Sequence, residues 1–570
     1  MLRSWDKIKP YKAMWDSILR ENNTDIVFMT FEWLYLWWKY HGEGKRLFFL
    51  VAKDDNNILG FCPLMEVPAR GYKEIRFIGG NELSYMGFPI KSGFKCAVLG
   101  SILDYLIGLK GNHMFNIHGI FKDADEYNIF KDYLDKTRRK YLKSSLECYF
   151  IGLHNRDYNS YIAGRFGRNS IRTMERKEKR LARLGELSFK PFTERDGDIE
   201  RIFDIHEKRW QRKVGHSKFS KGRTREFFKE LALSDKMPFE TSVDIIDVDG
   251  TPISFIYGFY YNGRYTFYRI GHDDNFAIFS PGELVLRKKL KDCFEKGYRV
   301  FDFGVGYEPY KAAWTDEKAD MIGFVFPGDG VLVNLIFNIQ RLVRNLRQFL
   351  KRDPRIYNFV KYKLGKFKML LYSGNAKKTF RRGIGRLKNR VVEIVAHIYS
   401  SYDYYIVYRP LISPDKADCG IYTVEEASIR KLGLLTEKLG MEPRDVHRRF
   451  LDENRCILVW DKKGIYSFWI DTHSIKIPAL NFNWNMEGGS TFIYQHFTGR
   501  MRSRISHGLL NSVLSYLNGL GYSRCYLVTG GRSDYLMNLT KDVGFSKFKR
   551  LRLKKRFGRM SYNKFEDITE

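Results

Sequence analysis

The segment 273–314 holds residue types whose order fits chemistry on a phosphate-bearing molecule. A Ser-Pro-Gly turn at 280–282 opens an expected helix, and the first turn of a helix offers free backbone N–H groups to a phosphate. A short strand follows the helix and leads through a glycine-bearing loop to Tyr310 and Lys311. If the strand delivers Lys311 to the same cleft, the segment predicts group transfer from a phosphate-bearing donor.

The turn also has a purely structural interpretation. Ser280 is a common N-cap residue, and proline is favoured at the first helical position, where Pro281 stands. In the phosphate interpretation, Pro281 presets the turn and Gly282 lets a ligand approach the backbone closely. The lysine motif downstream favours the phosphate interpretation.

The elements expected around the turn form a recognisable order. Residues 242–271 give the clearest strand signal of the chain, with turn signals at Asp249-Gly250 and Asn262-Gly263. The turn, a helix and the strand "VFDF" come next. The same order of hairpin, strand, turn, helix and strand recurs at 455–530. Residues 1–150 also alternate strand and helix patterns, with a helix at 30–42 and a hairpin at 47–67.

The composition sets the class of protein. With 570 residues and 44% hydrophobic content, the chain is too long for one core and apolar enough for several. The formal charge of +32 points to a polyanionic partner: nucleic acid, an anionic membrane face or a phosphorylated substrate. The seven cysteines are scattered without a C-x-x-C pair, which argues against a disulfide framework or a zinc site and fits a reducing cytoplasm. The twelve histidines lack metal-ligand spacing, so we expect no metal.

No apolar run reaches the roughly 18 residues that a membrane-spanning helix needs. Residues 341–390 carry 17 Lys or Arg and one acid, Asp353, and apolar residues recur at helical spacing from 332 to 350. One interpretation is a helical linker packed on a neighbouring domain. The other is a basic amphipathic segment on anionic lipid. We therefore expect a cytoplasmic protein, with peripheral binding at the inner face of the membrane as an option.

The strings "HEKRWQRK", "GTPISFIYGFYYNGRYTFYRIGHDDNFAIFSPGELVL" and "FDFGVGYEPYKAAW", with "FMTFEWLYLWWKYHG" and "GFCPLMEV" before them, resemble the GNAT acyltransferase superfamily. Within it, the chain looks like CelD-type (BioF-like) acetyltransferases and Fem peptidyl transferases over about residues 1–325. The resemblance implies an α/β (α+β) protein with tandem GNAT-like lobes and mixed central sheets. It implies lobes at 1–150 and 151–326, the second catalytic, followed by a basic helical linker at 327–400 and a weaker GNAT-like domain at 401–570.

The resemblance also implies the roles of particular residues. Acetyl-CoA or another acyl-CoA would be the donor, with its pyrophosphate at the turn formed by Ser280, Pro281, Gly282 and Glu283. A lysine at the position of Lys311 helps to stabilise charge on the attacked carbonyl in the Fem relatives.

Residues beside Lys311 complete the predicted catalytic group. Tyr310 precedes the lysine, and Asp302 would position it or act as a base. Glu308 is a weaker candidate for the same role and for binding substrate. The alternative is that Lys311 only pairs with Asp302 or Glu308.

Arg209 and Trp210 lie on one expected helix, beside the presumed acceptor cleft. Arg209 would bind a phosphate or carboxylate of the substrate, or else be an ordinary surface charge. The basic helix near 168–185 is open to the same two interpretations. In the last domain, arginines at 500, 502 and 504 stand where the superfamily has glycines, which puts acyl-CoA binding there in doubt.

The predicted function is acyl transfer from acyl-CoA to an amine or hydroxyl of a saccharide, a nucleotide-sugar or a lipid-linked sugar in surface polysaccharide biosynthesis. A Fem-like transferase that uses aminoacyl-tRNA is one alternative, and the positive charge suits it. A non-catalytic scaffold at an anionic membrane surface, built from degenerate GNAT folds, is the other.

Overall fold

The computed structural model describes residues 1–82, 85–192, 199–214, 219, 222–352, 399–411, 422–461, 464–477, 482–486, 488–498, 505–530, 534–556 and 559–567. The chain divides into two compact units, which are described separately. One comprises Met1–Lys179 and Glu186–Tyr357, and the other comprises Arg180–Gly185 and Asn358–Glu570.

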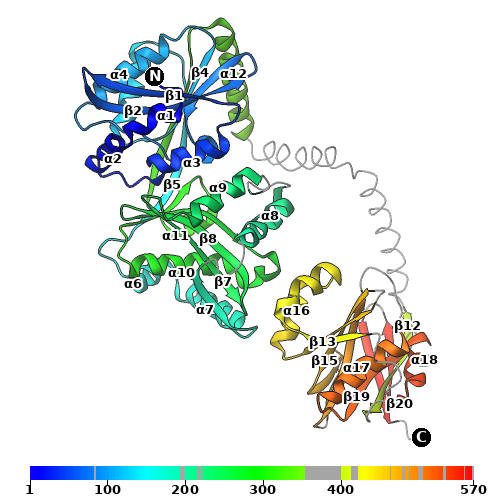
Figure 1. The fold of residues 1–570 in the computed structure, drawn as a ribbon. Helices are drawn as coiled ribbons and strands as arrows, with labels where there is room; N and C mark the ends of the chain where they lie inside the picture. Colours follow the sequence, from blue (N-terminus) through cyan, green and yellow to red (C-terminus); the bar gives the residue numbers. More distant parts are fainter. Residues whose placement is uncertain are drawn as a thin grey trace. The chain divides into compact units, whose positions relative to one another are not determined.

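The first half of unit 1 forms a lobe of helices and strands, drawn in blue and cyan in Figure 1. Its helices are α1 (Trp5–Ile8), α2 (Lys12–Glu21), α3 (Phe31–His41), α4 (Lys95–Ile107) and α5 (Asp125–Lys136). Its strands are β1 (Arg46–Asp54), β2 (Asn57–Ala69), β3 (Tyr72–Phe77), β4 (His113–Phe121) and β5 (Leu142–Gly152). The helix predicted at 30–42 and the hairpin predicted at 47–67 are confirmed by α3 and the β1–β2 pair.

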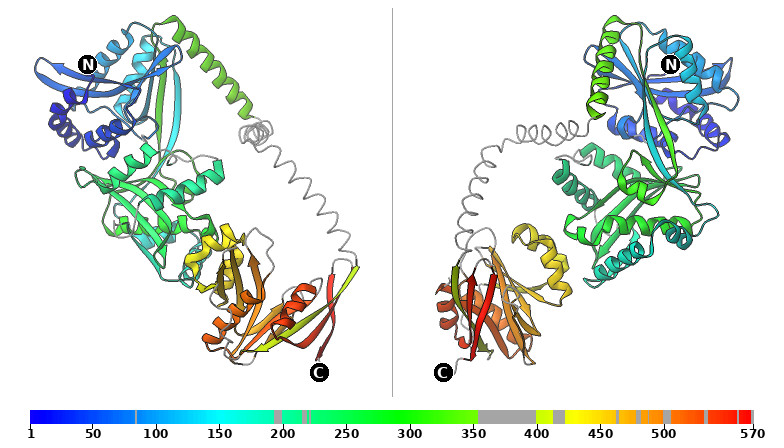
Figure 2. Two further views of the ribbon diagram at one scale, coloured as in Figure 1. Left: turned by 45° about the vertical axis from the view of Figure 1, so that its right-hand side comes forward. Right: turned by 180° about the vertical axis from the view of Figure 1, so that it is seen from behind.

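The second half of unit 1 forms the other lobe. Its helices are α6 (Tyr158–Arg165), α7 (Arg168–Ala182), α8 (Glu200–Val214), α9 (Gly222–Leu233), α10 (Pro281–Glu295) and α11 (Pro309–Trp314). Its strands are β6 (Leu187–Pro191), β7 (Glu240–Val248), β8 (Thr251–Tyr261), β9 (Arg264–His272), β10 (Val300–Val305) and β11 (Lys318–Pro327). Helix α12 (Val331–Arg352) follows β11 and lies along the first lobe (Figures 1 and 2).

One mixed sheet of eleven strands runs through both lobes, in the order β1-β2-β3-β4-β11-β5-β10-β9-β8-β7-β6. The late strand β11 lies between β4 and β5, antiparallel to both. Strand β5 passes from the first lobe into the second, where β10 pairs with its far end (Figure 1). The first lobe is therefore completed by a strand that comes from residues 318–327.

Unit 2 has a sheet of eight strands in the order β13-β14-β15-β18-β19-β12-β20-β21 and a separate β16–β17 pair. The strands are β12 (Tyr399–Pro410), β13 (Thr423–Ala427), β14 (Arg455–Asp461), β15 (Gly464–Asp471), β16 (Ser474–Ile477), β17 (Phe482–Asn485), β18 (Ser490–Thr498), β19 (Arg524–Gly530), β20 (Ser546–Arg556) and β21 (Arg559–Asp567). The helices are α16 (Pro443–Leu451), α17 (His507–Gly519) and α18 (Asp534–Asp542).

A strand, a helix and a parallel neighbouring strand occur in the same order three times. They are β3-α4-β4, β9-α10-β10 and β18-α17-β19, and the strands of each pair are hydrogen-bonded in parallel. In each case the first strand is also paired antiparallel with a preceding strand. The predicted α/β class with mixed sheets and repeated lobes is confirmed. The domain boundaries at 150, 326 and 400 stay predictions, and residues 353–398 of the expected linker lie outside the described residues.

Candidate functional site

The Ser-Pro-Gly turn joins the end of β9 to the start of α10 through a short helical turn, η6 (Asp274–Phe279). Ser280 has the left-handed backbone conformation, with φ = 53° and ψ = 52°, and its side chain makes no capping bond to α10. An ordinary N-cap residue has an extended backbone and caps with its side-chain oxygen. Ser280 therefore does not act as an ordinary N-cap, and a strained backbone of this kind is often associated with a functional turn.

The side chain of Ser280 contacts a cation instead. Lys177 Nζ on α7 donates to Ser280 Oγ at 2.8 Å. The next residue of α7, Glu178, pairs with Arg287 and, at 2.6 Å, with Lys288 on α10, so α7 is fastened along this helix. The basic helix predicted near 168–185 is thus α7, and it adds a positive charge at the positive end of the α10 dipole.

A second basic group lies near the turn. The Arg209 guanidinium on α8 contacts the His272 ring at the end of β9. A Cβ atom added at Gly282 would lie 2.9 Å from His272 Nδ1. The structure therefore places Arg209 close to the turn at 280–282, whereas the sequence interpretation assigned it to the acceptor cleft. Burial lowers the pKa of Arg209 below its ordinary value. Trp210 belongs to α8, but its side chain lies outside the described residues.

Strands β9 and β10 are parallel neighbours that separate along their length. Only Arg264–Thr266 of β9 pair with Val300–Asp302 of β10. Beyond these residues, β9 stays paired with β8 across a register shift between Phe267 and Arg269, and β10 shifts its register with β5. A gap that opens between two parallel strands gives a linear ligand access to their backbone groups. Because both strands end at the same edge of the sheet, the turn at 280–282 and the loop before Lys311 also follow the same edge.

Lys311 lies on α11 with a buried side chain, 6% exposed. Its Nζ donates to the carbonyl oxygens of Val305 at 3.2 Å and Gly306 at 3.3 Å, and Glu308 Oε2 is 3.5 Å away. Burial lowers the pKa of Lys311, and the nearby Glu308 carboxylate partly offsets this effect. The ammonium is thus held against the end of β10. Asp302 and Glu308 were both considered as its partner, and Glu308 forms the ion pair.

Asp302 is buried in β10, and both of its carboxylate oxygens are engaged. Oδ1 accepts from Tyr85 Oη at 2.6 Å and from the Gly304 N–H at 2.8 Å, and Oδ2 accepts from Arg264 at 3.1 Å. Arg264 also pairs with Asp25 at 3.0 Å. This network joins the two lobes of unit 1, and it gives Asp302 a positioning task. Its predicted role as a base is untested.

Tyr310 and Glu308 lie beside Lys311. Glu308 precedes α11, and its side chain is 48% exposed. Burial raises the pKa of Tyr310, and the neighbouring Glu308 adds to the rise, so the phenol keeps its proton at neutral pH. Pro281 is buried, and Glu283 lies in the first turn of α10, where its N–H donates to the Ser280 carbonyl at 3.0 Å. Pro281 has no N–H, so Gly282 offers the first amide of this helix.

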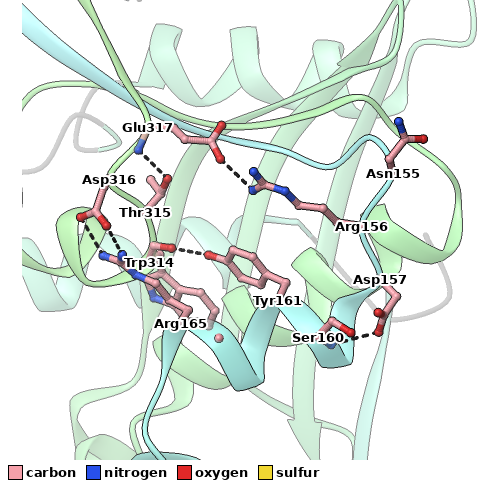
Figure 3. A pocket seen from close by; sticks show the side chains of 11 residues that line it. Asn155, Arg156, Asp157, Ser160, Tyr161, Arg165, Trp314, Thr315, Asp316 and Glu317 are labelled. Atoms are coloured by element: carbon pink, nitrogen blue, oxygen red, sulfur yellow. Dashed lines mark hydrogen bonds and ion pairs between the residues drawn. The ribbon is translucent and has the colours of Figure 1, made fainter.

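A cavity of about 540 Å³ lies elsewhere in the same lobe, between α6 and the segment after α11 (Figure 3). Its charged lining is internally paired: Arg156 with Glu317 at 2.8 Å, and Arg165 with Asp316. Tyr161, another lining residue, packs on Phe294 near the C-terminal end of α10. The turn at 280–282 lies at the opposite end of that helix, so this cavity is distinct from the candidate site.

In unit 2, α17 corresponds in its order to α10. Its N-cap, Ser506, accepts a hydrogen bond from the Leu509 N–H at 3.2 Å, as an ordinary N-cap does. The arginines at 500, 502 and 504 lie outside the described residues. Among the described residues of the chain, no group of His, Cys, Asp or Glu is arranged to hold a metal ion, and no helix is long and apolar enough to cross a membrane.

Sequence reasoning missed four residues of this region: Lys177, His272, and Tyr85 and Arg264, which both donate to Asp302. The basic pattern of α7 was visible in the sequence. However, nothing in it singles out Lys177, because only the packing of α7 on α10 selects the residue that reaches the turn.

One family model matches the part of the chain that contains the candidate site. Residues 168–312 match the family model of the acetyltransferase (GNAT) domain, and this range includes the turn, the separating strands and Lys311. No protein with a curated description matches the chain.

The chain is also similar to several solved structures. One is FemX, at 10% identity, with 55% of this chain and 95% of that chain covered and a TM-score of 0.40. Another is a conserved protein of unknown function from Bacteroides thetaiotaomicron, at 14% identity, with 55% and 97% covered and a TM-score of 0.37. A third is L-PGS from Bacillus licheniformis, at 11% identity, with 58% and 96% covered and a TM-score of 0.35. The family model is therefore the comparison that bears on the candidate site, and residues 168–312 of this chain are similar to the acetyltransferase (GNAT) domain.

Proposed function

We propose that the chain is an acyltransferase that moves an acetyl or other acyl group from acyl-CoA to an amine or hydroxyl group. The observation that carries the proposal is the left-handed turn at Ser280, which opens α10 inside the GNAT domain and is contacted by Lys177. A helix N-terminus with an added lysine suits a pyrophosphate. The gap between β9 and β10 suits the pantetheine arm of the same donor.

The transfer would be a direct displacement at the thioester. The acceptor nitrogen or oxygen forms a bond to the carbonyl carbon, and the electron pair of the C=O bond moves onto oxygen. The Lys311 ammonium, held at the end of β10, would stabilise that oxyanion. The oxyanion then collapses, the C–S bond breaks and CoA leaves as the thiolate. A base takes the proton of the acceptor, and Glu308, which is half-exposed beside Lys311, is the nearest described carboxylate for this role.

The donor proposal is tested by isothermal titration of acetyl-CoA into three proteins. We expect the wild type to bind and Gly282→Glu to lose at least about tenfold in affinity, because the new carboxylate places negative charge at the turn and a side chain against His272. Gly222→Glu is the matched control. It makes the same change in the first turn of α9, where no atom lies within 4 Å of the added Cβ. Equal affinity for all three proteins would exclude the turn as the donor site.

For the acceptor, we propose a saccharide or lipid-linked sugar of surface polysaccharide biosynthesis. This part is supported by the likeness of the quoted strings to CelD-type acetyltransferases and by nothing in the geometry. The test is acetyl transfer to amino sugars, nucleotide-sugars and lipid-linked saccharides, with free amino acids and peptides as comparison acceptors. Transfer to peptides alone would contradict the saccharide proposal and leave the donor proposal standing.

A second candidate is a transferase that takes its acyl group from aminoacyl-tRNA, and the net charge of +32 favours it. The two candidates differ in their salt dependence, since tRNA binding that neutralises several phosphates falls steeply with added salt. Tight tRNA binding with a steep salt slope, together with no affinity for acetyl-CoA, would favour this candidate. Acetyl-CoA binding that depends on Gly282 would exclude it as the main activity.

A further inference from the structure

Helix α12 has two apolar sides, and only one of them is packed. Val333 and Phe337 are 0% and 1% exposed and form a cluster with Met114 of β4. Tyr72, Leu142, Val325 and Ile336 are partly buried around this cluster. Ordinary core packing therefore explains one narrow side of α12.

The other side carries large apolar side chains that are open to solvent. Their exposed fractions run from 40% to 87%, and they are Val331, Leu332, Leu335, Ile339, Leu342 and Val343. At about 100° of rotation per residue, these six positions fall within an arc of roughly 120°, opposite to Val333 and Phe337. We call this set the outer apolar face of α12. A continuous exposed surface made of six large apolar side chains usually marks a binding surface.

The charged residues in the first fifteen positions of α12 have one sign. Residues 331–345 contain two arginines, Arg341 and Arg344, and no acid. Arg344 donates to the Lys143 carbonyl oxygen, and Lys73 on the neighbouring strand β3 is half-exposed. The sequence 341–390 as a whole carries 17 basic residues against one acid. At the same rotation per residue, Arg341 and Arg344 lie about 140° and 160° from the centre of the outer apolar face, on the side of Val333 and Phe337. The net positive charge of the sequence that continues from α12 nevertheless fits a surface that is negatively charged outside and apolar inside.

We propose that the outer apolar face of α12 binds an anionic membrane surface. The apolar side chains would lie at the boundary between headgroups and acyl chains, with the helix parallel to the membrane plane, and the net positive charge of the sequence 341–390 would attract the chain to anionic lipid. A second copy of the chain fits this face less well. A symmetric pair through it would bring two copies of this strongly basic sequence near each other, with no acid in residues 331–345 to neutralise them.

This surface is separate from the proposed acyl transfer. It lies on the first lobe, whereas the turn and Lys311 lie on the second. The chain can therefore bind vesicles without binding acyl-CoA, and it can bind acyl-CoA without binding vesicles. A negative result for one proposal leaves the other unaffected.

The test is co-sedimentation of the full chain with vesicles of roughly seven parts phosphatidylcholine to three parts phosphatidylglycerol, and with phosphatidylcholine alone. The variant Leu335→Gln/Ile339→Gln/Leu342→Gln removes the centre of the face without changing the charge. The matched control, Asn338→Gln/Asn345→Gln, changes exposed polar residues of the same helix. We expect the triple variant to lose at least about tenfold in partition to the anionic vesicles and the control to stay within about twofold. Melting curves should be the same for all three proteins, because every substituted side chain is exposed.

Three results would overturn the proposal. One is the absence of wild-type binding to the anionic vesicles. Another is equal binding by the wild type and the triple variant, which would show that the positive charge of the chain adsorbs without this face. The last is a concentration-dependent dimer of the wild type in sedimentation velocity that the triple variant abolishes, which would assign the face to a second copy.

Discussion

Ser280 shows how much one residue of this turn depends on its neighbours. Its backbone is left-handed and its hydroxyl faces Lys177 rather than the helix that it precedes. A non-glycine residue in this conformation costs of order 1 kcal/mol or more, so the surrounding packing must hold it. The proposed result is a set of amide and ammonium groups fixed in place before a phosphate arrives, which lowers the ordering cost of binding.

The contribution of Lys177 is measurable at this scale. We expect Lys177→Ala to weaken acetyl-CoA binding by about three- to tenfold, because one charge-assisted contact to phosphate is lost. Lys179→Ala is the control, since it removes the same charge from an exposed position of the same helix. Titration calorimetry at low and high salt measures the Kd of each variant for acetyl-CoA and so distinguishes their effects. If both variants weaken binding equally, only the overall charge of α7 matters.

Lys311 is expected to act on the rate rather than on donor affinity. The proposal predicts that Lys311→Met lowers kcat at least about a hundredfold and leaves the Kd for acetyl-CoA within about twofold. The lowered pKa means that burial disfavours the protonated lysine in the folded state. The unfolded chain therefore binds more protons between that lowered pKa and 10.5, and stability rises with pH in this window. Removing the charge should consequently cause no large loss of stability near pH 7, and unfolding curves check this.

The same shift predicts the shape of the pH–rate profile. The ammonium is the active form, so kcat should fall as the pH rises through the lowered pKa of Lys311, before an ordinary lysine would titrate. In Lys311→Arg the guanidinium stays charged, and this falling limb should move to higher pH in whatever activity remains. If the falling limb lies at the same pH in the wild type and in Lys311→Arg, then the titration of another group causes it.

At the scale of elements, β10 is held between the lobes by a buried polar network. Asp302 receives hydrogen bonds from Tyr85 of the first lobe and from Arg264 of β9, and Arg264 also reaches Asp25. The network fixes β10 at the position where it separates from β9, and so it sets the width of the gap that we propose for the donor.

Breaking this network should be costly. We expect Asp302→Ala to destabilise unit 1 by about 3 kcal/mol, because Arg264 would remain buried with only part of its compensation. Asp320→Ala removes a 40% exposed carboxylate of β11 that pairs with Lys122 at 3.4 Å, and it should cost less than about 1 kcal/mol. Urea unfolding followed by tryptophan fluorescence measures both. A similar small cost for the two variants would mean that Asp302 is free for a chemical role.

At the scale of the whole molecule, the order of the eleven-stranded sheet decides which pieces can fold. Strand β11 is the last of unit 1 in sequence, yet it lies between β4 and β5. A fragment of residues 1–357 keeps this strand, whereas residues 1–316 lack it. We expect the first fragment to unfold cooperatively and to bind acetyl-CoA, and the second to be insoluble or unstructured, because two neighbouring strands would lose their partner. Circular dichroism and hydrogen exchange check this, and a folded 1–316 fragment would show that the lobes are independent.

Sequence patterns placed the elements of the candidate site well. The turn signals at Asp249-Gly250 and Asn262-Gly263 lie between β7, β8 and β9, as predicted, and the Ser-Pro-Gly segment opens α10. These features are local, since turn chemistry and strand periodicity depend on residues that are close in sequence. The position of Arg209 could not be obtained in this way, because it depends on how α8 packs on β9.

The sequence by itself determined the mixed α/β class, the repeated order of strand, helix and strand, and the turn and lysine that suggest group transfer from a phosphate-bearing donor. Only the tertiary structure decided that β11 completes the first lobe, that Lys177 and Arg209 come to the same turn, and that α12 leaves one apolar side uncovered. The reason is physical. Periodicity records which side of an element is apolar, whereas contacts between residues far apart in sequence depend on how all the elements pack together.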